Sequence, residues 1–408
     1  SYSQDVDLVI KKSNLHYNQE YVIAYGPDAE LSDSSRMAVL VYRDLLQPPQ
    51  RIEMGKIENE WRAAYVLSDT SVKMILLAFQ TLDDSGRPLP ESIDNNGGEY
   101  WSIRVCDEYD VPVRGANMAV ALSYTGWGDL RETDADSALD YLYEELTLYP
   151  NNYAALKMKY SLLLRQFEYS AEIRQEIDEE VMSYIYEEPE NEERLNFALE
   201  AYRMIGNAEK AQEIEEKIID LDPKGDQAAA QRLSAIMKIE EVAVRLDSLE
   251  NFLQEFSGSR FTEYVLSGIT TAAIELGDYE RMKKVGDTLL KTANQPAGAA
   301  SLAGIAGVFT EKGKNLKRAV LYAKKAVELA QSFDQKIAPP EISEEDWEEY
   351  NQRLEARYQD VLGWALYQYG EPREGITYLE QAAEIMPQSS TYFHYGKALL
   401  SKEGAGID

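Results

Sequence analysis

Two patterns of hydrophobic and polar positions follow one another along the chain. Up to about residue 112, short runs rich in β-branched and aromatic residues are separated by turn residues, which is typical of β-strands. From residue 114 onward, hydrophobic residues recur at spacings of three, four and seven, which is typical of helices with one buried face. We therefore predict a β domain over residues 1–112 and a helical region over residues 113–408.

The β domain is predicted to be an antiparallel β-sandwich of immunoglobulin-like type, because six or seven short strands separated by turn signals are typical of that fold. Val72–Phe79 is apolar on both faces over most of its length, so we place it at the centre of a sheet. The predicted strands are Val6–Ile10, Tyr21–Tyr25, Met37–Tyr42, Trp61–Leu67, Val72–Leu82 and Tyr100–Val105.

The helical region is predicted to be an array of helix pairs. In Ala365–Pro387, two helical patterns flank a turn at Gly370-Glu371, and turn glycines recur upstream at 206, 277 and 313. One pair leaves part of its apolar face uncovered, so it needs a neighbouring pair. The predicted units are 114–150, 151–189, 190–223, 224–257, 258–296, 297–332 and 341–387, with an inserted loop over 332–343 and a terminal helix over Thr391–Leu400.

Small residues and prolines fall at matching places in several units. Ala211 and Gly375 each lie five residues after a turn glycine, where a close helix crossing requires a small side chain. The matching positions are Tyr202, Gly206, Ala211 and Pro223, then Ala319, Tyr322 and Ala326, then Leu362-Gly363, Gly370, Ala382 and Pro387. On these positions, residues 114–408 resemble the tetratricopeptide repeat family. The resemblance implies a right-handed superhelix whose concave surface holds a peptide or partner domain through the first helix of each pair.

A second resemblance covers about residues 6–105. The order of strands and the turn Asp94–Gly98, followed by Trp101, is similar to the starch-binding carbohydrate-binding modules of immunoglobulin-like fold. That resemblance implies sugar rings stacked on tryptophans, with Trp61 and Trp101 as the candidate carbohydrate-binding residues and Trp127 as a further platform. The chain departs from the family at Ile93, where a Trp usually precedes the turn. Packing of these tryptophans in a core is the alternative interpretation.

Composition limits the classes of partner. The 408 residues carry a formal net charge of −31, which argues against nucleic acid and anionic membranes and favours a neutral or basic partner. No window approaches the length of apolar sequence that a membrane span requires. A single cysteine, Cys106, excludes a disulfide within the chain, and only His16 and His394 could contribute imidazole to a metal site.

Candidate reactive groups are few, and no catalytic constellation or cofactor site is predicted. The carboxylates of 344–349 are expected on a solvated helix face rather than in a cleft. The oxygens of Asp94–Glu99 could suit calcium, with a plain β-turn as the alternative. His394 is expected to be packed or on the surface. Negative charge beside Cys106 is expected to raise its pKa and disfavour a reactive thiolate.

These features predict a non-enzymatic interaction scaffold with a protein or peptide partner. Carbohydrate binding by the β domain, with the array as a spacer, stays open as an alternative. So does a role as the positioning part of an exported thioredoxin-like redox protein, because the array ends half-way through a unit. The chain begins at Ser1 rather than Met, which favours a processed, exported bacterial protein of the periplasm or cell envelope, with a cytoplasmic home as the alternative.

Overall fold

A computed structural model describes residues 14–26, 30–31, 34–43, 45–128, 130–333 and 344–404. The predicted strand Val6–Ile10 and the predicted insertion, apart from its first two residues, lie outside the described residues. The chain divides into two compact units, Ser1–Ile214 and Glu215–Asp408, and each is treated separately below. The predicted domain boundary between residues 112 and 113 stays a prediction.

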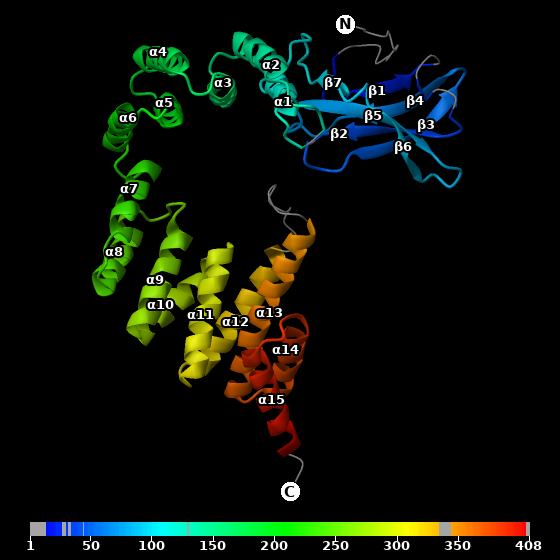
Figure 1. The fold of residues 1–408 in the computed structure, drawn as a ribbon. Helices are drawn as coiled ribbons and strands as arrows, with labels where there is room; N and C mark the ends of the chain where they lie inside the picture. The colour runs from blue at the N-terminus through cyan, green and yellow to red at the C-terminus, as the bar shows by residue number, and fades with distance from the viewer. Residues whose placement is uncertain are drawn as a thin grey trace. The chain divides into compact units, whose positions relative to one another are not determined.

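The β domain of the first unit is antiparallel, as predicted. Its strands run in the order β1-β4-β3-β2-β5-β6, and β7 also pairs with β5 (Figure 1). Strands β3 and β6 were not predicted from the sequence. Within the described residues, the strands are β1 (Glu20–Tyr25), β2 (Met37–Tyr42), β3 (Gln50–Ile57), β4 (Glu60–Val66), β5 (Met74–Leu82), β6 (Pro88–Asp94) and β7 (Trp101–Arg104).

Strand β5 lies at the centre of the sheet, as its apolar sequence predicted, because it pairs with β2, β6 and β7. Alternate side chains of β5 pack into two different cores. Ile75, Leu77 and Phe79 enter the core enclosed by the β-strands. Met74 and Leu76 instead pack against Val120 of the first helix. Burial on both faces therefore explains why this strand shows no hydrophobic–polar alternation.

The helical array follows the predicted units. Each of the seven predicted units contains two helices, and a fifteenth helix ends the array, which confirms the fold class. In the described residues the helices are α1 (Ala116–Ser123), α2 (Ala135–Leu148), α3 (Tyr153–Gln166), α4 (Ala171–Glu187), α5 (Glu192–Met204), α6 (Ala208–Leu221), α7 (Asp226–Met237), α8 (Val242–Glu255), α9 (Thr262–Leu276), α10 (Tyr279–Thr292), α11 (Pro296–Glu311), α12 (Leu316–Phe333), α13 (Glu344–Tyr369), α14 (Pro372–Ile385) and α15 (Ser389–Gly404).

Local capping chemistry sets the helix ends. The side chain of Asn152 accepts a hydrogen bond from the Ala155 amide at the start of α3, and Asp278 accepts one from the Arg281 amide at the start of α10. At the end of α9, Gly277 adopts φ 65°, in the left-handed region that glycine tolerates best. The first helix ends at Ser123, and its C-cap Tyr124 donates its backbone N–H to the Ala121 carbonyl.

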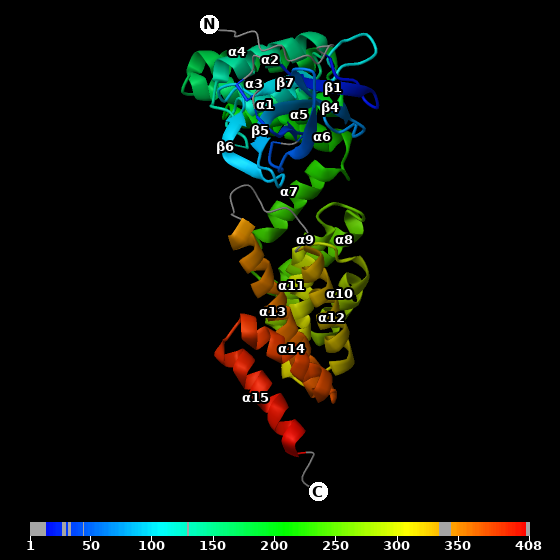
Figure 2. The same ribbon diagram turned by 90° about the vertical axis from the view of Figure 1, so that its right-hand side faces the viewer.

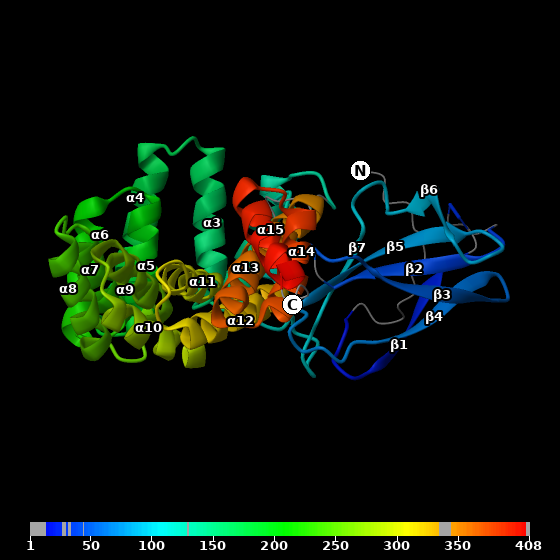
Figure 3. The same cartoon turned by 90° about the horizontal axis from the view of Figure 1, so that it is seen from below.

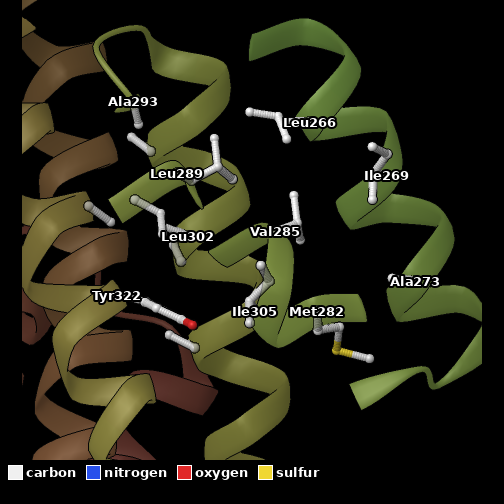
Figure 4. Close-up of a cluster of buried hydrophobic side chains, with 14 of the residues drawn as sticks. Leu266, Ile269, Ala273, Met282, Val285, Leu289, Ala293, Leu302, Ile305 and Tyr322 are labelled. Carbon is white, nitrogen blue, oxygen red and sulfur yellow. The ribbon is translucent and has the colours of Figure 1, made fainter. Parts of the chain in front are cut away.

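Each helix pair is buried against its neighbours. In the first unit, α3 and α4 form a hairpin (Figure 3). In the second unit, α9 to α13 lie side by side (Figure 2), and one continuous core joins α7 to α13. Figure 4 shows how Leu266 of α9, Val285 of α10 and Ile305 of α11 meet in this core. This is the mutual burial that the repeat pattern predicted.

Candidate interaction surfaces on the helical repeats

The tryptophans proposed for carbohydrate binding differ in their exposure. Trp61 in β4 is only 4% exposed and belongs to the β core, with the Lys56 ammonium 5.2 Å from its ring centroid. Trp101 in β7 is half-buried and packs edge-on against Phe79 at 5.2 Å between ring centroids. Trp127 is 43% exposed and follows α1. Carbohydrate binding stays a prediction, and burial leaves little of the Trp61 ring for a sugar.

The Asp94–Glu99 segment holds its shape through its own hydrogen bonds. Asp94 is 7% exposed; one oxygen accepts from the Tyr25 hydroxyl at 2.6 Å and the other from the Asn96 amide at 3.0 Å. Both carboxylate oxygens therefore serve structural bonds. Across the part of the chain that the structure describes, no group of three or more His, Cys, Asp or Glu side chains is placed to hold a metal ion.

The other candidate groups are Cys106, His394 and the described carboxylates of 344–349, and each has a burial, packing or solvent environment that the structure shows. Cys106 is buried, and burial raises the pKa of its thiol, with Asp110 and Asp107 adding to the effect. His394 of α15 stacks on Trp364 at 4.5 Å and bonds to Asp360 of α13, so it packs α15 onto α13. Glu348 and Glu349 are exposed, as expected for a solvated helix face.

A cleft lies on the first helices of the second unit, where the sequence predicted partner contacts. It has a volume of about 240 Å³. Met237, the last residue of α7, lines it together with Tyr264 and Thr271 of α9. Leu249 and Arg245 of α8 also line it, together with Ser267, Gly268 and Ala272 of α9.

A face poor in charged side chains continues from this cleft onto the next first helix. Tyr264 of α9 is 54% exposed, and Thr271 is also exposed. In α11, Ala300 and Gly304 are exposed, and the helix carries no charged side chain before its last residue, Glu311. The two helices are neighbours, so these residues form one surface, which we call the α9–α11 face.

Unlike the α9–α11 face, the second helices of this unit carry ion pairs that link one second helix to the next. In the pair between α10 and α12, hydrogen bonds from Arg318 and Tyr322 hold the pKa of Asp287 below its ordinary value, although burial alone would raise it. These are partly exposed pairs, and each contributes little to stability on its own. The pairs are Arg281 with Asp247 and Glu250, Arg318 with Asp287, and Lys324 with Glu374.

The first unit contains a larger pocket, between α4 and α6. Its volume is about 390 Å³, and its lining is mainly apolar. Tyr202 of α5 is buried beneath it, and burial raises the pKa of this phenol to about 12, with Asp178 adding to the effect. The lining residues are Met182, Ile185, Tyr186, Pro189, Tyr202, Lys210, Glu213 and Ile214. We call this the α4–α6 pocket.

The α4–α6 pocket was not predicted from the sequence, because partner contacts were expected on first helices. A signal was present in the sequence. Met182 and Tyr186 lie four residues apart, outside the buried stripe that Ile173, Ile177 and Val181 form on the same helix. Large apolar residues at one helical spacing beyond the core stripe indicate a second apolar face.

No family model matches the chain, and no curated protein matches it. Among solved structures, it is similar to a tetratricopeptide repeat protein from Parabacteroides merdae, at 14% identity over 69% of this chain and 97% of that chain, with a TM-score of 0.26. It is also similar to the APC/C hetero-tetramer Cut9-Hcn1, at 14% identity over 73% of this chain and 61% of that chain, with a TM-score of 0.29. A third similar structure is the human IFIT1 dimer with PPP-AAAA, at 15% identity over 67% of this chain and 65% of that chain, with a TM-score of 0.29. The chain covers less than two thirds of the latter two chains.

The helix pairs themselves define the class of this protein. Within the described residues, it consists of an antiparallel β domain followed by an array of seven helix pairs and a terminal helix. Every helix in the described ranges is too short or too polar to span a lipid bilayer.

Proposed function

We propose that this protein is a scaffold whose α9–α11 face holds a protein or peptide partner. The observation that supports the proposal is the scarcity of charge on these two helices: of the 31 residues of α9 and α11 only Glu263, Glu275 and Glu311 are charged, in a chain of which 28% of residues are charged. Depletion of charged residues marks the centre of protein–protein interfaces. The adjoining cleft adds a recess of about 240 Å³ that can receive one side chain.

The chemistry of the partner follows from the charge around the face. The chain has a formal net charge of −31, so it repels acidic partners and attracts basic ones over several ångströms. The α9–α11 face itself favours apolar or uncharged contact, because its exposed residues Tyr264, Ala300 and Gly304 offer no charged partner to a buried ion. We therefore propose a neutral or basic segment as the partner, with any basic residues at its ends.

Replacing Thr271 by arginine is expected to abolish partner binding at the α9–α11 face. Thr271 is exposed and lines the cleft, and an arginine there fills the recess with a long, charged side chain beside Arg245. The measurement is enrichment of a random peptide library displayed on phage, panned on the whole chain. Peptides selected by the parent protein should lose at least about tenfold in affinity for the variant, equivalent to about 1.4 kcal/mol.

Thr288 provides a matched control on a second helix. Each threonine is exposed, and each hydroxyl donates a hydrogen bond to the carbonyl four residues earlier in its helix. Thr288→Arg therefore makes the same chemical change on α10, away from the cleft. The proposed function would be contradicted if every selected peptide bound both variants equally well, or if the library yielded no binder.

A further inference from the structure

We infer that the α4–α6 pocket is a second docking site, for a peptide that inserts a bulky apolar side chain and carries lysine or arginine on both sides of it. The site goes beyond the proposed function, because it lies on second helices of the first unit and uses none of the α9–α11 face. The shape of the pocket and the charge around it both support such a ligand.

The pocket has the dimensions and lining of a site for an apolar anchor. A volume of about 390 Å³ lies within the range of small-ligand sites and exceeds one large side chain. Met182 is 51% exposed and Tyr186 is 88% exposed at its edge, so an inserted side chain would remove both from water. Tyr202 and Ile214 below are buried and give the anchor a fixed floor.

The charge around the pocket selects the flanking residues of the ligand. Residues 168–214 contain fourteen carboxylates and only four basic side chains. Two of those basic side chains already bond to carboxylates of this unit: Lys210 contacts both oxygens of Asp178, at 2.7 and 2.8 Å, and Arg194 contacts Glu187. The excess negative charge therefore favours cations supplied by the ligand, and it disfavours acidic peptides and anionic lipid surfaces.

The ammonium group of Lys210 shows how the site can hold a basic side chain of a ligand. The Lys210 ammonium lies 5.5 Å from the Tyr202 ring centroid and 3.3 Å from the Met182 sulfur, while it bonds to Asp178. Basic residues of a ligand would find the same combination of carboxylate and apolar surface at the exposed edge, where Glu213 lines the pocket. The long apolar stems of lysine and arginine suit this edge better than short polar side chains do.

The experiment measures binding of fluorescein-labelled hexapeptides to the whole chain by fluorescence anisotropy. Each peptide has two basic residues, two central residues drawn from leucine, isoleucine, methionine, phenylalanine, tyrosine and tryptophan, and two further basic residues. At least one should bind with a dissociation constant below about 1 mM. Replacing its central pair by serine should weaken binding about tenfold or more, and raising the salt concentration should weaken it further.

Variants of the protein locate the binding site. Met182→Lys should weaken binding about tenfold, because it places a cation in the pocket, and Tyr186→Ser should weaken it severalfold. Both side chains are at least half exposed, so the fold should be retained, which circular dichroism checks. Met237→Lys is the matched control, because Met237 is similarly exposed, at 44%, but lines the cleft beside the α9–α11 face in the second unit.

The outcomes separate this inference from the proposed function. Unchanged affinity for both Met182→Lys and Tyr186→Ser would overturn the docking site, as would the failure of every hexapeptide to bind. Loss of binding in Met237→Lys, with Met182→Lys unaffected, would place the peptide in the other cleft and also overturn it. Thr271→Arg should leave hexapeptide binding unchanged, whatever its effect on the α9–α11 face.

Discussion

Replacing Gly363 by alanine is expected to lower the free energy of unfolding of the second unit by about 3 kcal/mol, at the upper end of the usual cost of overpacking. Gly363 lies where α13 crosses α14. A Cβ atom at this position would lie 2.7 Å from the Gly375 carbonyl oxygen and 2.7 Å from Cγ of Leu379. Backbone cannot rotate out of the way as a side chain can, so the two helices would have to separate.

The contact is reciprocal, which strengthens the expectation. A Cβ atom on Gly375 would lie 2.6 Å from the Gly363 carbonyl oxygen. Each glycine thus admits the backbone of the opposite helix, and neither position can accept a methyl group without movement of the other. The position of Gly375 five residues after its turn glycine predicted this close crossing, and the geometry gives its physical reason.

Gly307 of α11 is the control for the Gly363 experiment. No heavy atom lies within 4 Å of a Cβ built there, so Gly307→Ala should stabilise the protein by up to about 1 kcal/mol through helix propensity alone. Urea unfolding followed by circular dichroism gives the free energies, and hydrogen exchange of α13 and α14 locates the change. Equal effects of the two substitutions would show that the α13–α14 crossing tolerates a methyl group.

The helical half of the molecule could be predicted because one physical requirement repeats along it. Each pair must show apolar residues at helical spacing, a turn that admits a left-handed residue and a small residue at the crossing. Gly206, Gly277, Gly313 and Gly370 all have positive φ, so the residues that set the predicted register are the ones that the turns require. Repetition made weak single-unit signals add up to a reliable assignment.

The β domain was harder to predict, because two strands lack the usual signals. Strand β3, Gln50–Ile57, is mostly exposed, and only Met54 within it is buried, so charged residues interrupt its pattern. Strand β6 begins at Pro88 and pairs only with β5, which is an edge position that tolerates proline. Burial decides strand propensity in a sheet, and burial depends on neighbours that the local sequence does not reveal.

The candidate sites depend even more on tertiary structure. The scarcity of charged residues in α9 and α11 is visible in the sequence, but a core helix has a similar composition, and the exposure of residues such as Ala300 and Gly304 separates the two cases. The α4–α6 pocket arises because two second helices leave a gap above Tyr202. Such a gap depends on the spacing between helices, which the hydrophobic pattern of either helix does not determine.

Replacing Arg131 by methionine is expected to destabilise the first unit by about 3 kcal/mol, through the loss of its buried hydrogen bonds. Arg131 follows α1 and is only 6% exposed. Its guanidinium donates to the Glu99 carbonyl at 2.7 Å and to the Ser102 hydroxyl at 3.1 Å, both at or near the start of β7. It also donates to the Ser123 hydroxyl of α1 at 2.7 Å.

Methionine keeps much of the apolar stem of Arg131 but supplies no donor, so it leaves these carbonyl and hydroxyl groups unsatisfied inside the protein. Arg131→Lys should recover only part of the stability, because one ammonium cannot reproduce the planar fork of donors. The control is Arg62→Met in β4: its guanidinium is 38% exposed and bonds to Glu60, so its loss should cost at most about 1 kcal/mol.

Thermal unfolding measures the loss of stability in Arg131→Met and Arg62→Met, and hydrogen exchange shows which elements each substitution destabilises. Arg131 joins β7 to α1, and the same two layers share the core of Met74, Leu76 and Val120. If Arg131 couples the layers, its loss should raise exchange in β7 and α1 together, while Arg62→Met leaves both unchanged. Faster exchange confined to α1 and α2 would mean instead that the β domain is stable without its first helices, as the predicted boundary at residue 112 implies.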